Sequence, residues 1–239
     1  MGEYPNSWGI GILDQQNELQ AGVKFPDKNV ITLVENSKRN LAQSFAYLLK
    51  TSRDVIVVSE ITLPEEVSEL VNSALRLNAG VSATMHSFSP NEVIPNLRNL
   101  MMKTPMYKDK NTAEEDIANC IDLIIHLKRL NNGRIVVDSI HEVCCDTSSR
   151  EELIREQEAF FHSGSEYEKD QVTLRFMNLG IMYMSNLLVG KNYTLRTLFR
   201  FNGHSWNTVD SPSEKYLNKM SRYAGQQSVI AIKKIFKGA

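Results

Sequence analysis

Residues 54–59 read DVIVVS, an almost unbroken run of β-branched side chains that is followed directly by Glu60. A strand buried on both faces of a parallel sheet has this continuous apolar pattern, whereas a half-exposed strand alternates apolar and polar residues. The run therefore predicts a central strand of a parallel sheet. The segments on either side of it decide how that sheet is built.

Short apolar runs alternate with amphipathic segments along the first half of the chain. Strands are predicted at residues 8–13, 29–34 and 81–85, and helices at 38–50, 64–77 and 90–102. Pro64 followed by Glu65 and Glu66 has the composition of a first helical turn, because proline lacks the donor that would be unpaired there. This alternation predicts an α/β fold with a mostly parallel twisted sheet and flanking helices.

The second half of the chain predicts a different arrangement. Residues 121–127 and 134–143 are apolar runs joined through Asn132-Gly133, a strong signal for an antiparallel hairpin. Further on, an exposed helix is predicted at 149–161, strands at 171–177, 181–189 and 194–201, and a last helical region after Pro212. The chain is therefore expected to comprise two domains, residues 1–146 and a C-terminal appendage, 147–239.

Composition limits the classes of function. The 239 residues are 42% hydrophobic and 23% charged, which is ordinary for a folded domain. The net charge of -1 gives no strong field towards nucleic acid. Three cysteines, two of them adjacent, form neither a disulfide framework nor a paired zinc site. The cysteine pattern predicts reduced, cytoplasmic thiols, and a soluble protein is expected because no run reaches the roughly 18 apolar residues of a membrane span.

Glu60 is the first candidate for chemistry, because it follows the predicted buried strand. The sheet would hold the carboxylate at its carboxyl edge, where open α/β folds bind ligands. In a nucleotide hydrolase an acid at this place orients the attacking water or the metal ion. The competing interpretation is that Glu60 merely ends the strand and faces solvent.

His86 occupies the corresponding position after the next predicted strand. The segment 82–90 reads SATMHSFSP and surrounds the imidazole with the hydroxyls of Thr84, Ser87 and Ser89. An imidazole there can hydrogen-bond a phosphate or a carboxylate. Taken alone, His86 fits a partly buried structural histidine equally well; two successive strands that end in Glu and His favour a site.

Several segments together resemble the hexameric ATPases of type II and type IV secretion systems, most of all the tight-adherence pilus and conjugation branches. Residues 53–66 (RDVIVVSEITLPEE) resemble that family's Walker B strand and 78–89 (NAGVSATMHSFS) its histidine box. Residues 117–143 resemble its later hairpin, and 193–203 (YTLRTLFRFNG) a strand near its C-terminus. These four segments occur in family order, and the resemblance implies a RecA-like fold.

The resemblance also implies roles for particular residues. Glu60 would be the Walker B acid and a magnesium ligand, and His86, with Thr84 and Lys50, would contact ATP. Residues 12–19 (ILDQQNEL) resemble the acidic box, which gives Asp14 and Glu18 catalytic roles. Asp14 stands where the family usually has glutamate and is one methylene shorter. Its alternative interpretation is a simple turn residue.

Departures from the family concentrate on the phosphate-binding parts. The phosphate loop G-x-x-x-x-G-K-[ST] does not occur: Gly190-Lys191 is followed by Asn192, and Ser185 stands at the first glycine position. Thr62 replaces the arginine that often follows the Walker B acid, and Ser59 replaces the glycine before it. By the resemblance, Met1 falls just after that loop and its helix. The chain alone is therefore expected to be inactive.

We consider three possible functions. The first is one subunit of a homohexameric motor that couples ATP hydrolysis to transport or pilus assembly, at the cytoplasmic face of a membrane complex. Its expected partner is an inner-membrane platform protein, without direct nucleic-acid contact. The second is a non-catalytic assembly or regulatory subunit with the same fold. A RecA-like nucleic-acid motor is disfavoured by the near-neutral net charge and the lack of a basic stripe.

Overall fold

The computed structural model describes residues 1–35, 40–74, 76–77, 80–145 and 193–237, with single positions at 173, 177 and 180. Its contacts define two compact units: Met1–Ile121 with Ser211–Ala239, and Asp122–Asp210. The predicted domain boundary after residue 146 and the predicted elements at 149–161 and 181–189 lie outside the described residues. Positions 173 and 177 are helical, which contradicts the strand predicted at 171–177. A short apolar run is compatible with the periodicity of a helix or of a strand, so the pattern at 171–177 does not distinguish the two.

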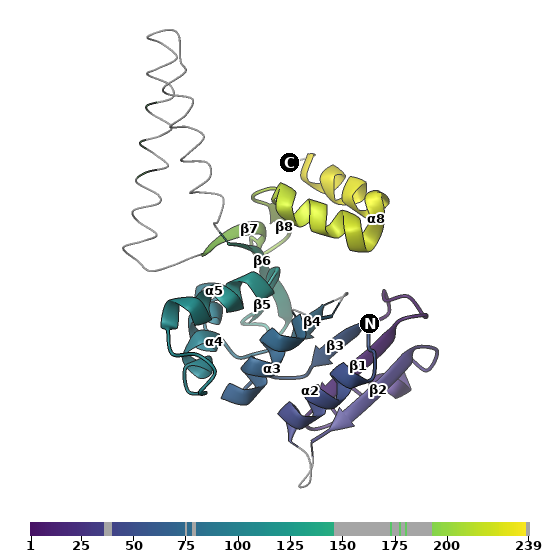
Figure 1. Ribbon diagram of the computed structural model, residues 1–239. Helices are drawn as coiled ribbons and strands as arrows, with labels where there is room; N and C mark the ends of the chain where they lie inside the picture. Colours follow the sequence, from purple (N-terminus) through teal and green to yellow (C-terminus); the bar gives the residue numbers. More distant parts are fainter. Residues whose placement is uncertain are drawn as a thin grey trace. The chain divides into compact units, whose positions relative to one another are not determined.

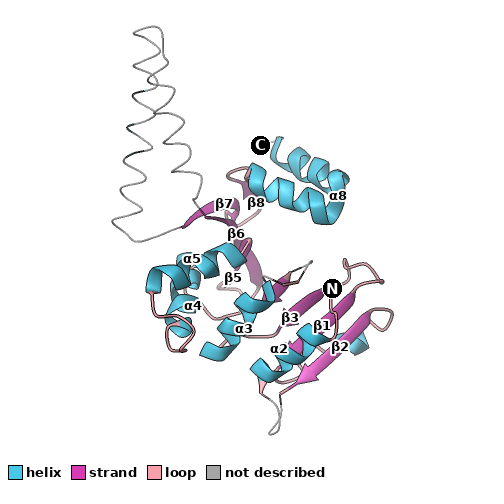
Figure 2. Ribbon diagram, in the orientation of Figure 1, coloured by secondary structure: helices cyan, strands magenta, loops and turns pink. Residues whose placement is uncertain are grey.

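The first unit contains a four-stranded parallel sheet (Figures 1 and 2). Its strands are β1 (Gly9–Asp14), β2 (Asn29–Val34), β3 (Val55–Val58) and β4 (Val81–Ala83), in the order β2-β1-β3-β4. Every pair in this sheet is parallel. The predicted α/β fold class is confirmed, and β3 is an interior strand with Val55, Ile56 and Val58 buried.

Six helical segments of this unit precede the antiparallel sheet. They are α1 (Ala21–Lys24), α2 (Leu41–Lys50), α3 (Pro64–Ala74), η1 (Pro90–Glu92), α4 (Val93–Met101) and α5 (Lys110–Cys120). Two of them, α2 and α5, begin at a residue whose side chain caps the helix. Asn40 starts α2, because its Oδ1 accepts from the Gln43 N–H at 2.8 Å while the Gln43 side chain accepts from the Asn40 N–H. This capping box sets the start of α2 later than the residue 38 that periodicity predicts.

The core of the parallel sheet depends on a close approach between β1 and α2. A Cβ atom at Gly11 would lie 2.9 Å from the Leu48 Cδ1 atom, so any larger residue there would require the Leu48 side chain to shift. Leu48 and Phe45 of α2 are fully buried. On β1, Ile10 and Ile12 pack in a cluster with Ala21 and Val55. This packing fixes the sheet that carries the candidate site.

The second unit contains the predicted hairpin as part of a four-stranded antiparallel sheet. Its strands are β5 (Leu123–Arg129), β6 (Ile135–Cys145), β7 (Tyr193–Phe201) and β8 (Trp206–Thr208), in that order. Gly133 has a φ of 82° in the turn between β5 and β6, as the Asn-Gly signal predicts. The three-residue β8 was not predicted.

The last helical region predicted after Pro212 is present as α8 (Glu214–Lys237). Gly225 interrupts it with φ 80° and ψ 165°, which are not helical values. Among the described residues, no helix combines the length and the apolar character that crossing a bilayer requires.

Candidate functional site

The carboxyl edge of the parallel sheet brings three predicted site residues to the ends of neighbouring strands. Asp14 is the last residue of β1, Glu60 follows β3 by two residues, and His86 follows β4 by three. Because β1, β3 and β4 run in the same direction, their carboxyl ends share one edge. The chain order of strands and helices produces this placement.

Glu60 and His86 form an accessible pair at that edge. The His86 Nε2 atom lies 3.4 Å from the Glu60 Oε1 atom. The His86 side chain is 97% exposed and that of Glu60 is 33% exposed. An acid and an imidazole that meet in solvent are available to a ligand, because neither is enclosed by the core. This is the strongest grouping of functional side chains that the described residues contain.

Hydrogen bonds between the loops hold Glu60 in place. The Ser59 N–H donates to the Leu13 carbonyl at 2.8 Å, and the Ile61 N–H donates to the Thr84 carbonyl at 2.8 Å. The Thr84 hydroxyl also donates to the Ser59 carbonyl. Both neighbours of Glu60 in the chain are therefore tied to the adjacent strands. Thr84, predicted to contact the cofactor, holds this loop through its hydroxyl hydrogen.

Glu66 supports the same loop and was not identified from the sequence. Its Oε2 atom accepts from the Thr62 N–H at 2.7 Å and from the Leu63 N–H at 2.9 Å. The side chain is buried, and Oε1 has no hydrogen-bond partner among the described residues. A glutamate in the first turn of a helix that follows a strand-end loop is the signal that indicates such a contact.

Asp14 is fully buried, which separates it from the exposed pair. Its Oδ2 atom accepts from the Leu19 N–H at 2.8 Å, so the carboxylate closes the loop after β1. Within the described residues its Oδ1 atom has no partner. Glu18 lies in this loop and is exposed. A buried carboxylate oxygen normally has a donor, a water or a cation beside it.

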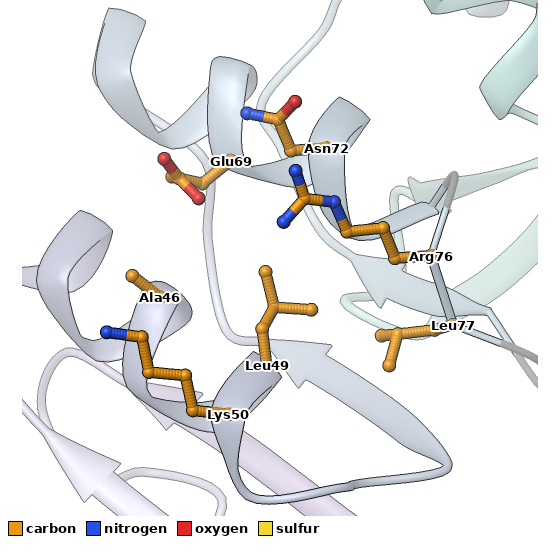
Figure 3. A pocket seen from close by; sticks show the side chains of 7 residues that line it. All are labelled: Ala46, Leu49, Lys50, Glu69, Asn72, Arg76 and Leu77. Atoms are coloured by element: carbon orange, nitrogen blue, oxygen red, sulfur yellow. The ribbon is translucent and has the colours of Figure 1, made fainter.

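Lys50 is not brought to the carboxyl edge. It ends α2 five residues before β3 begins, at the amino edge, where the Asp54 N–H donates to the Gly9 carbonyl at 2.8 Å. There Lys50 lines a cavity of about 380 Å³ between α2 and α3, beside Leu49 and Arg76 (Figure 3). Lys50 and Glu60 therefore lie at opposite edges of the parallel sheet.

Glu69 of α3 and Arg76, two residues beyond the end of that helix, both line the cavity (Figure 3). Burial raises the pKa of Glu69 above its usual value, and the nearby Arg76 charge limits the rise. The cavity is thus lined by two cations, one carboxylate and apolar surface from Leu49 and Leu77. It lies apart from the Glu60–His86 pair.

The remaining candidate groups are the cysteines and the possible metal ligands. None of the three cysteines, all of which lie among the described residues, forms a disulfide bond. Burial raises the pKa of Cys144 to about 11, so its thiol stays protonated at neutral pH and is a poor nucleophile. No group of three or more His, Cys, Asp or Glu side chains in the described part of the chain is arranged to hold a metal ion.

Comparisons with known proteins identify the fold. No family model and no curated protein sequence matches the chain. The chain is similar to the VirB11 ATPase of the Brucella suis type IV secretion system, solved in complex with sulphate, with a TM-score of 0.52 and 15% identity over 59% of this chain and 42% of that protein. The chain is also similar to the Legionella pneumophila ATPase DotB, with a TM-score of 0.40 and 14% identity over 79% of this chain and 58% of that protein.

The VirB11 match shows a shared fold. The chain spans less than two thirds of the length of either solved protein. At 15% identity the similarity to VirB11 shows a shared arrangement of the sheet and its helices, and the particular activity has to be argued from the site.

Proposed function

We propose that this chain is the motor part of a secretion-system ATPase subunit, with the nucleotide facing Glu60 and His86. The supporting observation is the accessible Glu60–His86 pair, 3.4 Å apart, at the carboxyl edge of a parallel sheet. Open α/β sheets bind ligands at this edge. The fold shared with the VirB11 ATPase agrees with that placement.

Each residue of the pair has a distinct proposed role. Glu60 orients the attacking water and lies close enough to solvent to serve as a magnesium ligand. Mg²⁺ is usually bound by one or two carboxylates together with substrate phosphates, so a single carboxylate at this edge fits its chemistry. His86 hydrogen-bonds the phosphate end of the nucleotide and reports its state to β4. ATP supplies the phosphoryl group when bound.

Asp14 and Glu18 take supporting parts in this proposal. Asp14 holds the loop after β1 through the Leu19 N–H, and Glu18 projects from that loop as an exposed acid. The Gln15 N–H also donates to the Ser59 hydroxyl at 3.2 Å, which ties the loop to the segment before Glu60. A movement of this loop would therefore shift the segment that positions Glu60.

The proposed setting follows the resemblance and the VirB11 similarity. The chain would act as one subunit of a homohexamer at the cytoplasmic face of a type IV or related secretion, pilus or conjugation system. An inner-membrane platform protein would receive the motion. With a net charge of -1, no direct contact with nucleic acid is proposed.

A second candidate is a non-catalytic assembly or regulatory subunit with the same fold. Two observations favour it: Asp14 is buried, and Lys50 lies at the opposite edge of the sheet. The 239 residues also contain no G-x-x-x-x-G-K-[ST] motif, whose backbone N–H groups and lysine bind phosphates.

The test joins the chain to an upstream segment that carries a phosphate loop, and measures magnesium-dependent ATP hydrolysis. Glu60→Gln should reduce turnover by about 10²-fold or more while ATP affinity changes little, because glutamine keeps the size of the side chain but loses its charge. Glu65→Gln is the matched control, since Glu65 is an exposed acid in the first turn of α3. Its turnover should match that of the unmodified protein.

The outcomes separate the two candidates. Equal hydrolysis by the Glu60→Gln and Glu65→Gln variants would show that Glu60 only ends the strand and would refute its proposed role. A joined protein that binds ATP but never hydrolyses it would favour the assembly subunit.

A further inference from the structure

The cavity between α2 and α3 is lined by three charged side chains, those of Lys50, Glu69 and Arg76 (Figure 3). None of the three forms an ion pair with any other residue that the structure describes. Cations often end helices because they complement the helix dipole, and this accounts for Lys50 and Arg76 taken singly. It does not account for a carboxyl group that lines the same cavity and pairs with neither cation.

Two helices that pack against each other supply these side chains. Lys50 is the last residue of α2, and Glu69 and Asn72 lie about one turn apart on α3. The Arg76 N–H donates to the Ser73 carbonyl at 3.0 Å, which fixes the turn that follows α3. Regular structure therefore positions the groups around the cavity.

The balance of charge limits what the cavity can bind. Two cations and one carboxylate give it a net charge of +1. A zwitterion such as an amino acid would leave one cation unpaired. A fully ionised sulfate or carboxylate would meet Glu69 without a hydrogen to donate to it. The ligand that fits carries a single negative charge together with an O–H group.

A phosphate group has this combination. Its second pKa is about 6, so near neutral pH it keeps an O–H group while other oxygens share the negative charge. A hydrogen bond from such an O–H to a carboxylate is charge-assisted and about twice as strong as a neutral one. Burial raises the pKa of Glu69, although the Arg76 charge limits the rise, and a more basic carboxylate is a stronger acceptor.

We propose that the cavity between α2 and α3 binds a protonated phosphate group, as the free ion or at the end of a small monoester. Arg76 donates two parallel hydrogen bonds to phosphate oxygens and Lys50 adds a point charge. Glu69 accepts the hydrogen of the phosphate O–H. The cavity of about 380 Å³ has the size of a small-molecule site, and Leu49 and Leu77 give it apolar walls for an organic group.

The proposal goes beyond the proposed function and does not rest on it. Lys50 lies at the amino edge of the parallel sheet, and Glu60 lies at the carboxyl edge. Phosphate binding between α2 and α3 needs neither ATP hydrolysis nor the Glu60–His86 pair. The two tests can therefore fail separately.

The test is an NMR titration of the full chain at constant ionic strength, followed at the Arg76 Nε–H and the Asn72 side-chain amide signals. At about pH 6.5 inorganic phosphate retains an O–H, whereas sulfate has a similar shape and carries no hydrogen. Phosphate should therefore bind about tenfold or more tightly than sulfate. Phenyl phosphate distinguishes the two sources of the group: tighter binding than inorganic phosphate indicates a monoester, and equal or weaker binding indicates the free ion.

Variants test the role of each charge. Glu69→Gln should remove the preference for phosphate, because the glutamine amide can donate to sulfate as well. Glu65→Gln, at an exposed acid of the same helix, is the matched control and should keep the preference. Arg76→Gln should weaken phosphate binding about tenfold or more. Lys24→Gln, which removes an exposed cation at the end of α1, should leave it unchanged.

Three results would overturn the proposal. One is equal affinity of the unmodified chain for phosphate and sulfate, or binding of neither. Another is a preference for phosphate that survives Glu69→Gln. The third is an equal loss of phosphate binding in the Arg76→Gln and Lys24→Gln variants, which would show a general effect of surface charge.

Discussion

At the scale of single residues, the local environment decides which charged groups are available for chemistry. Glu60 and His86 follow strand ends and remain open to solvent. Asp14 ends the adjacent strand and is nevertheless fully buried. The sequence places all three at one edge of the sheet, but their accessibility depends on how the loops fold.

The burial of Asp14 illustrates what could not be predicted. The loop after β1 turns back so that the Leu19 N–H reaches the Asp14 carboxylate, and Asn17 and Gln20 adopt positive φ values of 57° and 46°. Neither residue is a glycine, so the sequence carries no clear signal for these conformations. The position of Lys50 at the amino edge, in contrast, follows from strand and helix order and could have been predicted.

His141 makes the stability of the second unit dependent on pH. The imidazole is buried, with Nε2 2.9 Å from the Ser139 hydroxyl oxygen and Nδ1 3.1 Å from the Thr197 hydroxyl oxygen. Burial lowers the pKa of His141, and the Arg200 and His126 charges lower it further. In the folded protein the ring thus takes up a proton less readily than in the unfolded chain.

The sign of the effect follows from this lowered pKa. In the unfolded state His141 binds a proton below its ordinary pKa of about 6.5, so the free energy of unfolding falls as pH drops through that value. The His141→Gln variant should show a smaller fall between about pH 7.5 and pH 5.5, measured by urea denaturation. His204→Gln, at an exposed position, is the control. Identical pH dependence in the His141→Gln variant and the unmodified protein would refute this account.

At the scale of elements, boundaries were predicted well where local sequence determines them. β2 matches its predicted range, and α3 starts at Pro64 as predicted. The β5–β6 hairpin forms around the Asn-Gly turn. The elements that were missed, α1 and β8, are four and three residues long, too short to show periodicity.

The capping box of α2 offers a test at this scale. Asn40→Ala removes the acceptor for the Gln43 N–H and should lower the free energy of unfolding by about 1 kcal/mol. Asn40→Asp is the matched control, because aspartate caps helices about as well as asparagine. Urea denaturation measures both. If alanine and aspartate destabilise the protein equally, the hydrogen bond from Gln43 contributes nothing and α2 is held by Phe45 and Leu48 alone.

At the scale of the whole molecule, the chain combines a parallel sheet that carries the Glu60–His86 pair with a separate four-stranded antiparallel sheet. The contacts divide the chain after Ile121, where the parallel α/β unit ends and the antiparallel sheet begins. Sequence patterns predicted both kinds of sheet. Which face of the antiparallel sheet stays uncovered depends on packing between distant segments, and residue patterns do not encode that directly.

The central claim is that nucleotide binds at the carboxyl edge beside Glu60 and His86. The most direct test is an NMR titration of the five histidine side chains of the unmodified chain with ATP and Mg²⁺. We expect weak binding, with a dissociation constant of about 1 mM, because no phosphate loop is present. The ring signals of His86 should shift, while those of His126 and His204 stay in place. If the ring signals of His86 do not shift, the assignment of the nucleotide site is contradicted, whether or not the signals of another histidine shift.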